Sequence, residues 1–162
     1  MKIVLYQPQI PQNTGNIART CAATQTGLIL IKPLGFSTNS RHLKRAGLDY
    51  WDGVNIEEMD DLESLLKQTK TDFYFFSSKA SQLYTENTYS LNSLLIFGSE
   101  TEGLPSWTRE KWPERFFTIP MIKNHRCLNL ASSAAVVLYE ALRQNDFIFP
   151  NKHVLPERQT AN

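Results

Sequence analysis

The hydrophobic residues of the chain form short unbroken runs that alternate with segments of helical period. The runs predict strands over residues 3–6, 28–31, 73–76, 94–97 and 116–119. The segments of helical period predict helices over 13–25, 57–68, 105–112 and 130–144, with a short polar helix or turn over 41–46. Because the runs lack polar alternation, we expect strands buried on both faces, as in a parallel sheet covered by helices. The pattern therefore predicts an α/β fold.

Two of the predicted helices carry recognisable end signals. The helix over 13–25 has Asn13 or Thr14 as its expected N-cap and Gly27 as its stop. The helix over 130–144 is apolar around nearly its whole circumference, so it needs burial on more than one side. Asn129 or Ser132 is its expected N-cap.

Length and composition predict one globular domain. The 162 residues, 41% hydrophobic and 20% charged, exclude a disordered or fibrous chain. We expect the domain to span residues 1–150, followed by a flexible polar tail over 151–162. The net charge of +1 gives no overall attraction to nucleic acid, so RNA or DNA binding would need local basic patches. Such patches occur over 41–45 and 123–126, and more loosely over 109–115.

The sequence gives no indication of a metal site, a disulfide or a membrane-spanning segment. Cys21 and Cys127 are far apart and lie in no metal-binding spacing, and the three histidines show none either. No apolar run approaches the roughly 20 residues that a membrane-spanning helix needs. The N-terminal apolar run is too short for a signal peptide. We therefore expect a metal-free, cytoplasmic protein with no membrane partner.

Three segments at the ends of predicted strands carry unusual polar residues, and ligands of open α/β sheets bind beyond such ends. Residues 8–19 place Asn13 and Arg19 in the first turns of a helix. Residues 97–105 place acidic side chains between two glycines, which allow close approach of the backbone to a ligand. These carboxylates and the lack of a Lys-Ser/Thr pair exclude a phosphate-binding P-loop. Residues 119–134 form a basic, Asn- and Ser-rich loop that leads into the most apolar helix.

Taken one at a time, each segment also has a purely structural interpretation. Asn13 and Asn129 are residue types that cap helices, and the glycine-rich segment suits a strand–turn–helix connection. The basic residues fit a solvated face. Cys127 has no His and carboxylate partners in sequence that would indicate a thiol enzyme.

Taken together, the segments IVLYQPQIPQNTGNIART, LLIFGSETEGLP and IPMIKNHRCLNLASS resemble the SPOUT superfamily of RNA methyltransferases. The resemblance covers roughly residues 2–149 and is to the branch that methylates ribose 2′-hydroxyls, in particular its small single-domain members. It implies a mostly parallel sheet flanked by helices with a deep C-terminal trefoil knot, which is a rare exception to unthreaded topology. It further implies S-adenosylmethionine as cofactor, S-adenosylhomocysteine as product, no metal, a homodimer, and the tRNA anticodon stem-loop as partner.

The resemblance also assigns roles to individual residues. The cofactor-binding positions are Phe76, Gly98, Gly103, Ile119, Cys127 and Leu128. The catalytic positions are Arg19, Asn13, Glu100 and Asn129, with Arg19 of one subunit serving the cofactor of the other. The candidates for RNA phosphate contacts are Arg41, Lys44, Arg45, Lys123 and Arg126. At position 127 related proteins usually carry Ser, so Cys127 is a departure from the pattern.

The implied reaction is methyl transfer to the ribose 2′-hydroxyl of tRNA nucleotide 34, cytidine or modified uridine. Because the pKa of arginine exceeds about 12, we expect Arg19 to bind the neighbouring phosphate and stabilise the developing alkoxide. Two alternatives are methylation of another tRNA position or of rRNA, and a catalytically idle RNA-binding module. The intact set of Asn13, Arg19, Glu100 and Asn129 argues against the idle module.

Overall fold

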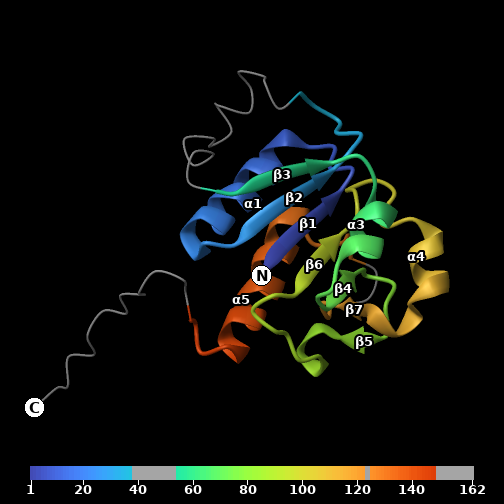
Figure 1. The fold of residues 1–162 in the computed structure, drawn as a ribbon. Coiled ribbons are helices and arrows are strands. Elements are labelled where there is room, and N and C mark those ends of the chain that lie inside the picture. The colour runs from blue at the N-terminus through green and yellow to red at the C-terminus, as the bar shows by residue number, and fades with distance from the viewer. Residues whose placement is uncertain (38–53, 123–124, 149–162) are drawn as a thin grey trace, which may run out of the picture.

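The computed structural model describes residues 1–37, 54–122 and 125–148 (Figure 1). Within these residues, seven parallel strands form one sheet in the order β3-β2-β1-β6-β4-β7-β5. The strands are β1 (Lys2–Tyr6), β2 (Gly27–Ile31), β3 (Ile56–Met59), β4 (Phe73–Phe76), β5 (Gln82–Leu83), β6 (Leu94–Phe97) and β7 (Phe116–Thr118). The helices are α1 (Pro11–Thr24), α3 (Leu62–Gln68), α4 (Ser106–Lys111) and α5 (Leu130–Gln144), with 3₁₀ turns η2 (Tyr84–Glu86) and η3 (Pro113–Arg115). The predicted α/β class and all five predicted strands are confirmed.

The central strand shows why the apolar runs are unbroken. In β1, Ile3 and Leu5 belong to one hydrophobic cluster, whereas Val4 between them belongs to a second cluster on the opposite face of the sheet. All three side chains are fully buried. Val4 lies opposite Ile29 of β2 and Ile96 of β6, so the pattern continues across neighbouring strands. Both faces of the sheet are therefore covered, as the absence of polar alternation predicts.

Helices cover the two faces in separate layers (Figure 1). On one face, α1 and α5 pack on each other and on the sheet, burying Ile17 and Cys21 of α1 with Val137 and Leu138 of α5. On the other face, α3 supplies its leucines, and Trp107 of α4 and Trp112 just after it pack at the border of the same cluster. None of the described helices is long and apolar enough to cross a membrane.

The first helix begins two residues earlier than predicted, and the predicted cap is wrong. α1 starts at Pro11, with Ile10 as N-cap and no side-chain cap. Proline suits the first helical position because its φ is already helical and the N–H it lacks would have no partner there. The side chain of Asn13 therefore does not cap α1 and can form hydrogen bonds elsewhere. The predicted stop at Gly27 is also wrong, because Gln25 (φ 53°) takes the left-handed C-cap position and Gly27 opens β2.

The predicted helix over 57–68 is wrong in its first half. Residues 56–59 form the edge strand β3, which pairs with β2. The helix α3 starts only after Asp61, whose side chain accepts a hydrogen bond from the Ser64 N–H at 2.7 Å. The two-residue strand β5 is too short to leave a periodic pattern in the sequence. The segment predicted over 41–46 and the tail over 151–162 lie outside the described residues.

Candidate active site

A cavity of about 1170 Å³ opens where the carboxyl ends of β1, β6, β4 and β7 meet. The carboxyl ends of these strands contribute Tyr6, Phe97, Phe76 and Thr118 to its walls. All three sequence segments with unusual polar residues also reach it, through residues including Asn13, Glu100 and Asn129. The sheet order explains this convergence, because segments far apart in sequence follow strands that are neighbours in space.

The glycine-rich segment after β6 forms a tight loop held by its own backbone. Ser99 and Gly103 exchange two N–H···O=C hydrogen bonds of 3.0 and 3.1 Å. Gly103 has φ +75°, which a residue with a side chain rarely adopts. A Cβ on Gly98 would lie 2.2 Å from the carbonyl carbon of Gly103. Gly98 therefore allows the backbone of Gly103 to come close within the same loop. The sequence predicts only a close approach of the backbone to a ligand.

A chain of hydrogen bonds links this loop to the first and last helices. The Glu100 carboxylate accepts from the backbone N–H groups of Gln9 (2.9 Å) and Ile10 (3.2 Å) and from Asn13 Nδ2 (2.8 Å). Asn13 Oδ1 accepts in turn from Asn129 Nδ2 at 2.8 Å. Asn129 Oδ1 caps α5 by accepting from the N–H of Ala131 at 2.8 Å, so the predicted cap of this helix is confirmed. Three of the four predicted catalytic residues thus form one network on the cavity wall.

The orientation of both amides in this network is determined by chemistry. The free N–H groups at the start of α5 need an acceptor, so the oxygen of Asn129 faces the helix and its NH₂ faces Asn13. Asn13 must then present its oxygen to Asn129 and its NH₂ to Glu100. An ionised carboxylate only accepts, so every donor meets an acceptor. Because Asn13 is only 5% exposed, a mismatched partner would leave a buried polar group unsatisfied.

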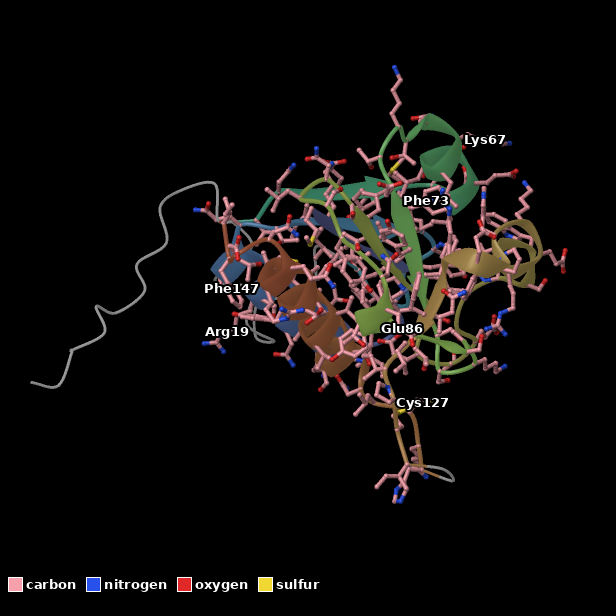
Figure 2. All side chains as sticks on the ribbon, turned by 90° about the horizontal axis from the view of Figure 1, so that it is seen from below. Arg19, Lys67, Phe73, Glu86, Cys127 and Phe147 are labelled. Atoms are coloured by element: carbon pink, nitrogen blue, oxygen red, sulfur yellow. The ribbon has the colours of Figure 1, made fainter. Side chains whose placement is uncertain are left out.

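The six residues predicted to bind the cofactor all line the cavity: Phe76, Gly98, Gly103, Ile119, Cys127 and Leu128. Cys127 is exposed on the segment after β7, and its Sγ lies 3.3 Å from Ser78 Oγ of the loop after β4. Figure 2 shows this segment projecting from the body of the molecule. Burial raises the pKa of the other cysteine, Cys21, to about 12, so its thiol is inert.

Arg19 does not reach this cavity. It is exposed on α1, on an outer stripe that also carries Gln12, Asn16 and Ala23. Figure 2 shows Arg19 well away from Cys127 of the cavity wall. The structure therefore separates the predicted catalytic arginine from the three residues with which the sequence groups it.

The model of the SpoU rRNA methylase family matches residues 1–139, most of the chain. The chain belongs to this family. The predicted membership of the RNA methyltransferases is thereby confirmed. Three proteins similar to this SpoU methylase are compared with it by sequence identity, coverage and, for the solved structures, TM-score.

A tRNA (cytidine(34)-2′-O)-methyltransferase from Methylovorus glucosotrophus is 46% identical over 147 residues, which are 90% of this chain and 96% of that protein. A solved structure concerned with the 2-OH methylation of C/U34 on tRNA is 41% identical, with a TM-score of 0.82 over 90% of this chain and 95% of that one. The AdoMet-bound rRNA methyltransferase from Sinorhizobium meliloti is 25% identical, with a TM-score of 0.77 over 88% of this chain and 55% of that one.

Of the candidates for RNA contacts in this SpoU methylase, only Arg126 lies among the described residues. Arg126 lines the cavity and is exposed. The other candidates, Arg41, Lys44, Arg45 and Lys123, lie outside the described residues. Within residues 1–37, 54–122 and 125–148, no group of His, Cys, Asp and Glu side chains could hold a metal ion.

Two basic residues that the sequence did not assign to the site also line the cavity of this SpoU methylase. Lys79 follows β4, so applying the strand-end rule to the run over 73–76 would have found it. Arg109 lies inside α4 and reaches the cavity because its guanidinium packs on the ring of Phe116, with the guanidinium carbon 5.0 Å from the ring centroid. No local sequence pattern predicts that packing.

Proposed function

We propose that the protein transfers a methyl group from S-adenosylmethionine to the ribose 2′-hydroxyl of nucleotide 34 in tRNA. The observation that carries the proposal is the convergence of Asn13, Glu100 and Asn129 on one cavity in a SpoU methylase. The Methylovorus relative and the C/U34 structure, at 46% and 41% identity over nearly the whole chain, support this reaction and this nucleotide. A tRNA substrate also favours the cytoplasm as its location.

The cavity fits S-adenosylmethionine in size and in wall chemistry. Its volume of about 1170 Å³ exceeds what one nucleoside-sized ligand needs. The stacked rings of Phe76 and Phe97 give an apolar wall, and the exposed backbone of the loops from Gly98 and Ile119 gives donors and acceptors. We propose that Phe76, Gly98, Gly103, Ile119, Cys127 and Leu128 hold the cofactor. The AdoMet-bound Sinorhizobium relative supports this choice. When bound, the cofactor supplies an electrophilic methyl group on a sulfonium.

The chain's own residues then bind and orient the ribose. We propose that Asn13 and Asn129 fix the wall beside the reacting hydroxyl, and that Glu100 acts by holding Asn13 and the turn at Gln9 in place. Such fixed positioning lowers the barrier because the hydroxyl oxygen needs a narrow approach geometry. The Arg19 guanidinium would bind the adjacent phosphate and stabilise the developing alkoxide.

We propose that Arg19 acts in the cavity of a second copy of the chain. Arg19 lies on an exposed stripe of α1, and α1 packs beside α5. The outer side of α5 exposes Val136 (39%) and Tyr139 (48%), one turn apart. This helix is apolar almost all round, yet one chain leaves that side uncovered. A homodimer through α1 and α5 would cover the apolar side and carry Arg19 toward a partner's cavity.

We further propose that the C-terminal segment is threaded as a trefoil knot. The chain leaves β7 near one edge of the sheet, and α5 then packs on α1 and β6 near its middle. In the segment between them, Ile119, Met121 and residues 126–129 line the cavity. A threaded path would hold that wall rigidly in place, which a site for near-attack positioning requires.

The test is methyl transfer from labelled S-adenosylmethionine by the purified protein to tRNA and, in parallel, to rRNA. We expect label in tRNA alone. Label in rRNA alone would favour the alternative rRNA substrate. Failure to transfer any label, with tRNA binding retained, would favour an idle RNA-binding module.

A further inference from the structure

The cavity wall also carries basic side chains that take no part in the hydrogen-bond network of Glu100, Asn13 and Asn129. Lys79, Arg109 and Arg126 line the cavity from the loop after β4, from α4 and from the segment before α5. None of the three forms an ion pair with another described residue. By contrast, Lys111 of α4 is paired with Glu63 at 3.0 Å. Among the described residues, these three cations of the cavity wall therefore lack an ion-pair partner, although Glu100 and Glu102 also line the cavity.

Arg109 is the most firmly placed of the three. Its guanidinium lies over the ring of Phe116, which is buried in the core at 5% exposure. Stacking on a fixed ring restricts the side chain before any ligand binds, so less conformational entropy is lost on binding. The N–H groups around the edge of a stacked guanidinium remain available to an oxyanion, and Arg can bind phosphate through two of them.

We propose that Arg109 binds a backbone phosphate of the substrate RNA at the mouth of the cavity. The proposal rests on the proposed function, and it extends the basic RNA-contact surface beyond Arg126 to Arg109, a residue that the sequence places only in the loose basic patch over 109–115. Phosphate is favoured because the proposed substrate carries one at every nucleotide, so a cation at the mouth meets one whichever base is read. The carboxylate of the cofactor is the competing anion.

The chain offers a matched control in Arg115. Its guanidinium carbon also lies over a phenylalanine ring, Phe73, at 4.3 Å from the centroid. Arg115 is paired, however, with Glu114 at 3.7 Å and with the Phe73 carbonyl at 3.3 Å, and it does not line the cavity. Arg109→Gln and Arg115→Gln therefore remove the same charge and a similar ring contact, but only the first removes from the cavity wall a cation with no ion-pair partner among the described residues.

The experiment measures tRNA affinity over a series of salt concentrations, and S-adenosylmethionine affinity by calorimetry, for both variants and the unaltered protein. We expect Arg109→Gln to bind tRNA roughly tenfold more weakly at low salt. The negative slope of log K against log salt should become shallower by about 0.7, as expected for the loss of one phosphate contact. Cofactor affinity should be unchanged, and Arg109→Lys should restore most of the slope.

Two results would overturn the inference. Arg109→Gln could match Arg115→Gln in tRNA affinity and salt slope, or it could weaken cofactor binding while tRNA binding is kept, which would assign Arg109 to the cofactor carboxylate. A failure of the proposed function is distinguishable from both. In that case the unaltered protein itself would transfer no methyl group to tRNA.

Discussion

The side-chain amide of Asn129 donates a hydrogen bond to Oδ1 of Asn13 across 2.8 Å, although 116 residues separate the two along the chain. The contact joins the cap of α5 to the first turn of α1. Through Asn13 it also reaches Glu100, which holds the backbone at Gln9 and Ile10. One polar network therefore fixes the relative positions of the three segments that form the cavity.

Substitution at Asn129 should separate capping from this linkage. Asn129→Ala removes both the cap and the bond to Asn13, so we expect a loss of about 2 kcal/mol in the free energy of unfolding. Asn129→Asp keeps an acceptor for the helix but places a second acceptor against Asn13 Oδ1. We therefore expect it to be more stable than Asn129→Ala by about 1 kcal/mol and still defective in kcat. Urea titration and methyl-transfer kinetics measure the two effects. Normal activity in Asn129→Asp would contradict the positioning role.

The glycines of the loop after β6 should differ in their tolerance of alanine. At Gly98 a Cβ would overlap the backbone of Gly103, so Gly98→Ala should cost about 3 kcal/mol in stability and weaken cofactor binding. At Gly103 the space is open and only the positive φ is strained, so Gly103→Ala should cost about 1 kcal/mol. Thermal unfolding of the two variants gives the comparison. Equal stability losses would mean that the loop shifts to make room for the alanine side chain at position 98.

The two cysteines should react very differently with alkylating reagents. Burial raises the pKa of Cys21 to about 12, which leaves it protonated and inaccessible below that pH, whereas Cys127 is exposed on the cavity wall. Iodoacetamide at mildly alkaline pH should modify Cys127 alone in the native protein and both cysteines after unfolding. Saturating S-adenosylmethionine should slow the modification of Cys127. Unchanged labelling with the cofactor present would argue that Cys127 does not contact it.

Sequence reasoning was most successful where local pattern determines structure. The apolar runs predicted strands because each run is buried on both faces, as Ile3, Val4 and Leu5 illustrate. It was wrong where tertiary contacts override the local pattern. The run 56–59 contains helix-compatible residues but adds an edge strand to β2, and Asn13 is a good capping residue whose side chain is needed inside the cavity wall.

The convergence of the three polar segments on one cavity could be predicted from the sequence, but the arrangement of their side chains could not. The strand-end rule brings the segments of Asn13, Glu100 and Asn129 to one edge of the sheet. It says nothing of Arg109, which reaches the cavity by packing on Phe116, nor does it reveal that Arg19 faces away. Both positions depend on which face of a helix meets the sheet.

Mixing two inactive variants would test whether Arg19 acts across a dimer. Arg19→Ala leaves the cavity intact, and Gly98→Ala leaves Arg19 intact. If Arg19 serves the partner's cavity, a heterodimer of the two contains one complete site, so the mixture should regain activity after subunit exchange. If Arg19 serves its own cavity, no complete site forms and the mixture stays inactive. Light scattering on the unaltered protein, with Val136→Glu as an interface variant, establishes the dimer itself.

The most direct test of the proposed activity uses an anticodon stem-loop with a single 2′-deoxy substitution. The unsubstituted RNA and the RNA lacking only the 2′-hydroxyl of nucleotide 34 are incubated with the protein and labelled S-adenosylmethionine, and methyl incorporation is measured. We predict incorporation into the first RNA and none into the second, because the acceptor oxygen is missing. Equal incorporation into both would show that the methyl group goes elsewhere and would contradict methylation of ribose 34.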